Sequence, residues 1–137
     1  MEYNKHSICN ANLPLFVDEF SKEFASCKVA LLINFFSRYN QVELDIRYRN
    51  IIVFITPLGL LRQTTLPMGA TNSIAQFVRI VTKILENFIL DTCWLFVDDV
   101  GVKGLYTTYD YKEVCLGVRR YIIEHIQELD RTLERIE

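Results

Sequence analysis

The sequence lacks several patterns that mark large functional classes. Its 137 residues include only two histidines, His6 and His125, and its four cysteines form no C-x-x-C pair. These counts and spacings exclude the usual zinc constellations. Widely spaced cysteines favour reduced thiols. We therefore expect an intracellular protein, without a basis for choosing between cytoplasm and nucleus.

Long apolar runs and a strong net charge are also missing. The longest apolar runs fall well short of the roughly 20 residues that a membrane span needs. The first residues do not form the apolar segment and cleavage site of a signal peptide. The net charge is −2, so any basic surface for nucleic acid must be local. We predict no membrane partner.

The composition is that of a globular domain. Half of the residues are hydrophobic and 23% are charged, which is typical of folded rather than disordered chains. The length suits one domain with a core, and no repeat or linker interrupts it. We predict a loose N-terminal arm over residues 1–13 and a single domain over 14–137.

Hydrophobic periodicity predicts an α+β fold. Apolar residues recur at helical spacing over three ranges, about 15–24, 72–90 and 111–136. Apolar runs bounded by turn signals predict strands at about 29–33, 42–45, 51–56, 60–66, 93–98 and 100–103. This order favours an antiparallel sheet with helices packed on one face, including the helices at 72–90 and 111–136.

Two adjacent carboxylates, Asp98 and Asp99, lie between two of these predicted strands. The run Cys93 to Gly104 predicts a hairpin with both aspartates at or beside its turn. Neighbouring carboxylates on a rigid tip repel each other and attract hard cations such as Mg²⁺. Aspartate is also simply a good turn former, so this string alone leaves both interpretations open.

Three stretches in order carry more information than the hairpin alone. They are Asn34-Phe35-Phe36-Ser37-Arg38-Tyr39-Asn40-Gln41-Val42-Glu43-Leu44-Asp45, then Phe54-Ile55-Thr56-Pro57 through Leu66-Pro67-Met68-Gly69-Ala70-Thr71-Asn72-Ser73, then Phe96-Val97-Asp98-Asp99. Together they resemble the reverse transcriptase of gypsy-type LTR retrotransposons, with a special likeness to fungal members. The resemblance covers roughly residues 12–136.

The resemblance implies a reverse-transcriptase-like palm with part of the fingers, taken from a retrotransposon Pol polyprotein. It implies an RNA-directed DNA polymerase that uses Mg²⁺ or Mn²⁺, with an RNA/DNA template–primer and a dNTP as partners. Asp98 and Asp99 match the family's metal ligands. Asn34 stands where the family's other catalytic carboxylate ends a neighbouring strand, so we expect it within about 10 Å of Asp98.

The resemblance also implies a nucleotide-binding set. Tyr39 matches the aromatic residue under the incoming sugar, and Phe35 and Phe36 accompany it in the same motif. Pro67, Met68 and Gly69 resemble the loop that borders the nucleotide pocket. Gln41 belongs to the pattern without an assigned role.

The sequence departs from the family pattern at two positions. Asn34 offers one neutral carbonyl oxygen where the family has a bridging carboxylate. We expect a loss of about 4 kcal/mol at the transition state, which is about a thousandfold in rate. Arg38 stands where the family usually has glycine, and it would be strained if that turn needs a positive φ. We predict an impaired enzyme.

The family continues beyond the region matched here, into the rest of the palm, the thumb and RNase H. We therefore expect a truncated domain without these Pol segments. Such a domain should bind the phosphates of a duplex only weakly. It should also expose a sheet edge that promotes self-association. The alternative function is a non-catalytic remnant, or a domesticated module of the same fold that binds nucleic acid or protein.

Several other residues fit two interpretations each. Trp94 and Phe96 suit a core better than base stacking, and His125 on an apolar helical stripe suits packing better than catalysis. The last helix suits packing on the sheet better than a coiled coil. Four basic residues suit solvated charges better than phosphate contacts: Arg62, Arg79, Lys83 and Lys103.

Overall fold

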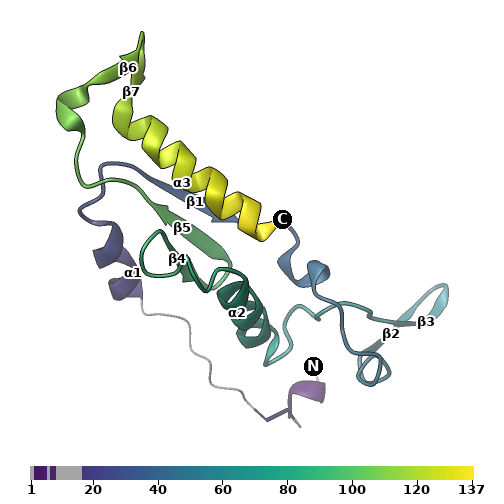
Figure 1. Cartoon of the computed structure of the whole chain (residues 1–137). Coiled ribbons are helices and arrows are strands. Elements are labelled where there is room, and N and C mark those ends of the chain that lie inside the picture. Colours follow the sequence, from purple (N-terminus) through teal and green to yellow (C-terminus); the bar gives the residue numbers. More distant parts are fainter. Residues whose placement is uncertain (1, 6, 9–16) are drawn as a thin grey trace. The chain divides into compact units, whose positions relative to one another are not determined.

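The computed structural model describes residues 2–5, 7–8 and 17–137 (Figure 1). The chain divides into two compact units. The first comprises Met1–Leu13 and Phe35–Arg79, and the second comprises Pro14–Asn34 and Ile80–Glu137. Helices and antiparallel strands are both present, so the predicted α+β class is confirmed. The assignment of 14–137 to one domain stays a prediction.

The second unit is built on a three-stranded antiparallel sheet. Its strands β1 (Ala30–Asn34), β5 (Asp99–Lys103) and β4 (Cys93–Phe96) lie in the order β1-β5-β4. These strands form where the sequence is rich in β-branched and aromatic residues. In the register, Asn34 lies opposite Asp99, and Phe96 lies opposite Asp99 from the other side. The predicted adjacency of these three strands is confirmed.

Helix α1 (Val17–Phe24) covers one face of this sheet. The Phe20 ring contacts both Phe24 and Phe96, with ring centroids 4.8 and 5.7 Å apart. A Cβ on Gly101 would lie 2.4 Å from the tip of the Phe24 ring. Glycine at this position therefore lets the helix approach the central strand. Residues 15 and 16 of the predicted helix lie outside the described residues.

The opposite face of β5 is fully buried. Val100 and Val102 alternate with Gly101 along the strand, and both have no exposed surface. Helix α3 (Arg120–Ile136) contacts β5 (Figure 1). Helices therefore pack on both faces of the sheet, and the expectation of one covered face is wrong. The second covered face is due to the short helix α1, which packs over Gly101.

The last predicted helix begins nine residues later than expected. A hairpin of β6 (Glu113–Cys115) and β7 (Val118–Arg119) occupies its predicted start. Gly117 has φ +76°, and its N–H donates to the Glu113 carboxylate at 3.2 Å. A left-handed residue cannot continue a right-handed helix, so α3 starts only after this turn.

The middle helix is shorter than predicted at its C-terminal end. α2 covers Ser73–Ile84, and the chain then turns toward β4. Leu90 has φ +83°, and its carbonyl accepts hydrogen bonds from Trp94 Nε1, at 3.3 Å, and from Lys103 Nζ. These two donors fix a backbone conformation that is incompatible with the predicted helix to residue 90.

The first unit contains a two-stranded hairpin and several turns. β2 (Val53–Thr56) pairs with β3 (Gly59–Arg62), and β3 ends four residues before the predicted strand does. The predicted strand at 42–45 is reduced to an isolated bridge between Glu43 and Thr65. Extended pairing stops there because the chain from Asp45 onward forms turns closed by backbone hydrogen bonds.

The described part of the N-terminal arm is hydrogen-bonded to the rest of the first unit. Residues Glu2–Lys5 form a 3₁₀ turn. Asn4 donates to the Gly69 carbonyl and accepts from the Thr71 N–H, both at 2.9 Å. Residues 9–13 of the predicted arm lie outside the described residues. Across the described part of the chain, no helix has the length and apolarity to cross a membrane.

Candidate functional site

The aspartate hairpin of the second unit forms the centre of the candidate site. Phe96 pairs with Asp99, which leaves Val97 and Asp98 as a two-residue turn. Val97 has φ +57°, at a position that hairpins usually give to glycine. A β-branched residue is strained there. The turn holds Asp98 and Asp99, both half-buried, at the predicted end of the two strands.

Asn34 lies beside these carboxylates at the end of β1. It is the direct cross-strand partner of Asp99, and its Nδ2 donates a hydrogen bond to Asp99 Oδ1 at 2.7 Å. Asp98 directly precedes Asp99 in the chain, so its Cα lies within about 9 Å of the Asn34 Cα. The structure therefore brings the three predicted catalytic residues together.

The donor set does not fit a two-metal centre. Two carboxylates are present, and the third position presents an N–H donor to Asp99 rather than a further anionic oxygen. Among the described residues, no three acidic, histidine or cysteine side chains gather so as to hold a metal ion. The Asn34 amide thus satisfies an oxygen that a cation would otherwise bind.

Two of the predicted nucleotide-binding residues lie together in the first unit. The Tyr39 ring is almost fully buried and meets the Phe77 ring edge-on, with centroids 5.9 Å apart. Phe35 meets the same ring edge-on at 5.5 Å. Such edge-on geometry is favourable for aromatic pairs. Phe77 was predicted only as part of an apolar stripe, and no sequence signal identified it as the support of both rings.

The other predicted nucleotide-binding residues differ from one another in burial. Phe36 and Met68 expose 85% and 72% of their surface. The buried Pro67 accepts a hydrogen bond at its carbonyl from Ser73 Oγ at 2.6 Å, and Gly69 has φ +83°. The Pro67–Gly69 loop is thus anchored at its first residue and left-handed at its last.

The turn that carries Tyr39 explains Gln41 and tests the condition set for Arg38. Gln41 Nε2 donates to the Phe36 carbonyl at 2.7 Å, so its role is to close the turn. The left-handed residue is Ser37, with φ +50°. Arg38 is not at a positive φ, and its guanidinium lies 4.7 Å from the centre of the Tyr39 ring. The condition for strain at Arg38 is therefore not met, because the positive φ falls on Ser37.

Comparison with solved structures identifies the class of fold. The chain has a reverse-transcriptase-like fold, because four solved structures are similar to it over 96–98% of its length. No protein-family profile matches the sequence, and no curated protein matches it.

These structures are all of foamy virus protease-reverse transcriptase. The native prototype foamy virus enzyme has a TM-score of 0.73 and 16% identity, over 97% of this chain and 16% of that one. The enzyme bound to double-stranded DNA has 0.71 and 17%, over 96% and 21%. The complex with an RNA/DNA hybrid has 0.70 and 17%, over 96% and 16%. This chain thus spans about a sixth to a fifth of their length.

Proposed function

We propose that this chain is the palm and part of the fingers of a reverse transcriptase, from the Pol polyprotein of a gypsy-type retrotransposon, with impaired polymerase chemistry. The fold of the second unit, with Asn34, Asp98 and Asp99 on adjoining strands, supports the palm assignment. The sequence motifs support the gypsy-type and fungal affinity. The β2–β3 hairpin then belongs to the fingers.

One contact carries the proposal of impaired chemistry: the Asn34 amide donates to Asp99. A carboxylate at position 34 would add negative charge and two acceptor oxygens to the hairpin tip, whereas the amide contributes a donor. This exchange removes the kind of ligand that hard divalent cations prefer. We therefore propose a nucleotidyltransferase fold with at most weak Mg²⁺ or Mn²⁺ binding at Asp98 and Asp99.

The proposed partners are a template–primer duplex and a dNTP. Solved neighbours with this fold include complexes with double-stranded DNA and with an RNA/DNA hybrid. In this chain, the half-buried Phe35 ring is supported by Phe77, the almost fully buried Tyr39 packs against the same ring, and the Pro67–Gly69 loop supplies backbone groups. We propose that these residues form the nucleotide side of the site.

The test combines Mn²⁺ binding with primer extension. The unmodified chain should bind Mn²⁺ weakly and give no measurable extension, and Asn34→Asp should bind Mn²⁺ at least about tenfold more tightly. Asn87→Asp adds the same charge at an exposed position of the second unit and should leave binding unchanged. Robust template-directed extension by the unmodified chain would overturn the proposal of impairment.

The alternative is a module of this fold that binds nucleic acid without catalysis. It predicts duplex binding that weakens as salt increases, with no dependence on Asp98 or Asp99. If Asp98→Asn and Asp99→Asn leave both duplex binding and Mn²⁺ binding unchanged, the carboxylates have no retained role and the alternative is favoured.

A further inference from the structure

The end of the Pro67–Gly69 loop is held by the side chain of Asn4. This amide donates to the Gly69 carbonyl and accepts from the Thr71 N–H, both at 2.9 Å. Within the described part of the chain, Asn4 is the only hydrogen-bond partner of these two backbone groups. A carbonyl only accepts and an N–H only donates, so the amide has one orientation that satisfies both. One side chain therefore bridges the loop and the residues before α2.

The contact between the arm and this region is reciprocal. Asn72 Nδ2 donates to the Ile8 carbonyl at 2.8 Å, so each segment supplies a side chain to the backbone of the other. Apolar burial does not hold this part of the arm, because Ile8 exposes 90% of its surface. The three hydrogen bonds join residues that lie 64 to 67 positions apart in the sequence.

The loop needs an outside partner because its second half is permissive. Ser73 Oγ donates to the Pro67 carbonyl at 2.6 Å and fixes the first residue. Gly69, at φ +83°, has the largest conformational freedom to lose when the loop becomes ordered. A loop that is ordered before its ligand arrives binds more tightly, because less freedom is lost on binding. Asn4 thus orders the part of the loop that Ser73 does not contact.

We propose that Asn4 is a positioning residue of the nucleotide site. It acts through the backbone of Gly69 and Thr71 and does not itself contact the nucleotide. The nucleotide role rests on the proposed function, in which the Pro67–Gly69 loop borders the dNTP. The described part of the N-terminal arm then serves the site by holding this loop in place.

Amide hydrogen exchange tests the contact itself. Asn4→Ala removes both hydrogen bonds, so the Thr71 amide should exchange at least about tenfold faster. Asn4→Asp keeps an acceptor oxygen at the same position and should keep the Thr71 amide protected. The Leu66 amide, which donates to the Val42 carbonyl at 2.8 Å, reports whether the unit stays folded. Its exchange should be unchanged in both variants.

Nucleotide binding tests the positioning role. The probe is dTTP with Mg²⁺, followed by NMR titration. Asn4→Ala should bind dTTP about fivefold more weakly than the unmodified chain, because the loop must then become ordered on binding. Asn50→Ala is the matched control, since it removes one exposed hydrogen bond, from Arg62 at 2.7 Å, elsewhere in the first unit. It should leave dTTP binding unchanged.

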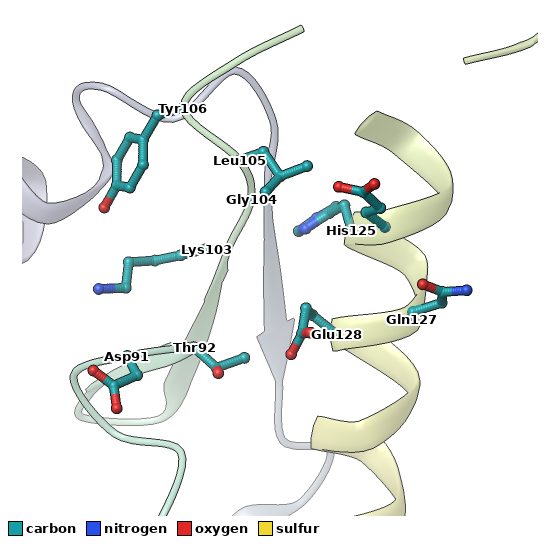
Figure 2. Close-up of a pocket in the computed structure, with 10 residues that line it drawn as sticks. Asp91, Thr92, Lys103, Gly104, Leu105, Tyr106, His125, Gln127 and Glu128 are labelled. Atoms are coloured by element: carbon teal, nitrogen blue, oxygen red, sulfur yellow. The ribbon is translucent and has the colours of Figure 1, made fainter. Parts of the chain in front are cut away.

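A cavity of the second unit provides an internal control for the titration. It has a volume of about 560 Å³, which is large enough for a small ligand. Figure 2 shows Glu128 extending from α3 toward Thr92 in this cavity. Glu124 also lines it, and such carboxylates repel a triphosphate. The Gly104 amide, at the same cavity, should therefore not shift. A shift at Gly104 as large as that at Thr71 would overturn the proposal.

The two measurements distinguish two failures. Unchanged dTTP binding or unchanged Thr71 exchange in Asn4→Ala would overturn the positioning role, and so would equal weakening of dTTP binding by Asn50→Ala. If the unmodified chain binds no dTTP, the proposed nucleotide site is overturned and the positioning role falls with it. Thr71 exchange that still depends on Asn4 would then show that the contact exists and that the nucleotide assignment is what failed.

Discussion

At the scale of single residues, the contact between Asn34 and Asp99 sets the charge balance at the end of the two strands. The two side chains face each other across the sheet, and an amide can donate to a carboxylate at 2.7 Å without repulsion. Two carboxylates at the same positions would repel, and like charges directly opposite each other destabilise a sheet. The present sequence therefore favours a hairpin that is stable without a cation.

This pairing predicts a cation-dependent stability for Asn34→Asp. Without divalent cations at pH 7, the variant should lose about 1 kcal/mol of unfolding free energy. The loss should disappear on adding Mn²⁺. It should also disappear below about pH 3, where protonation removes the repulsion. Thermal denaturation checks this, with Asn87→Asp as the control. A loss that persists under both conditions would instead indicate a packing defect.

Asp45 provides a titration test in the first unit. Its carboxylate accepts side-chain hydrogen bonds and a backbone hydrogen bond from Arg47, which lower its pKa to about 2. Because the folded pKa is depressed, this stabilisation is present above about pH 4 and is lost as the pH falls through about 2. NMR titration should give this low pKa, and Arg47→Gln should raise it toward 3.8.

The control for the Asp45 titration is Arg79→Gln, which removes an exposed arginine at another position of the same unit. It should leave the pKa of Asp45 unchanged. An Asp45 pKa near its ordinary value in the unmodified chain would show that the Arg47 contact does not persist in solution.

At the scale of elements, α1 and β5 depend on one glycine. An added Cβ at Gly101 would meet the Phe24 ring at 2.4 Å and the Phe20 ring at 3.0 Å. Gly101→Ala should therefore cost about 1–3 kcal/mol through overpacking. Phe24→Leu removes the nearest ring atoms, so adding Gly101→Ala to it should cost clearly less. A double-mutant cycle of denaturant unfolding measures this coupling, and equal costs in both backgrounds would contradict the contact.

The elements also show what the sequence could predict. The β4–β5 hairpin was found because aromatic and β-branched residues flank the aspartates, and β1 because an apolar run ends at a polar residue. The predicted start of the last helix was too early, because Val114 and Val118 have helical spacing although they lie on two short strands. Only Gly117 indicated the turn between them.

The candidate site was predictable in position but not in its contacts. Three motifs placed Asn34 near Asp98 and Asp99, and the register agrees. The direction of the Asn34 hydrogen bond and the support of two rings by Phe77 depend on packing across distant segments. Local patterns do not contain that information, since it comes from tertiary contacts.

At the scale of the whole molecule, the β2–β3 hairpin predicts self-association. Its two strands pair only with each other among the described residues, and Ile55, Leu58 and Leu60 expose 85%, 92% and 68% of their surface. Residues 51–61 contain no charge. Isolated hairpins are marginally stable, and uncharged apolar edges recruit further strands. Sedimentation velocity should therefore detect oligomers of the unmodified chain.

A charged pair at this hairpin should suppress the association. Ile55 and Leu60 are direct cross-strand partners, so Ile55→Lys with Leu60→Glu adds charge while forming an attractive pair. Leu116→Glu, at the fully exposed tip of the β6–β7 hairpin, is the matched control and should leave the oligomers intact. A monomeric unmodified chain at high concentration would contradict this surface as the cause.

The order of the strands along the chain delays the pairing of β1 during synthesis. Asn34 can pair with Asp99 only after a further 65 residues have been synthesised. At about 5–20 residues per second, that interval lasts about 3–13 s. During this time the apolar β1 has no neighbouring strand of its sheet, while the segment Phe35–Arg79 of the first unit is being made. The β4–β5 hairpin can close locally within microseconds once it emerges, so β1 docks last on a hairpin that is already formed.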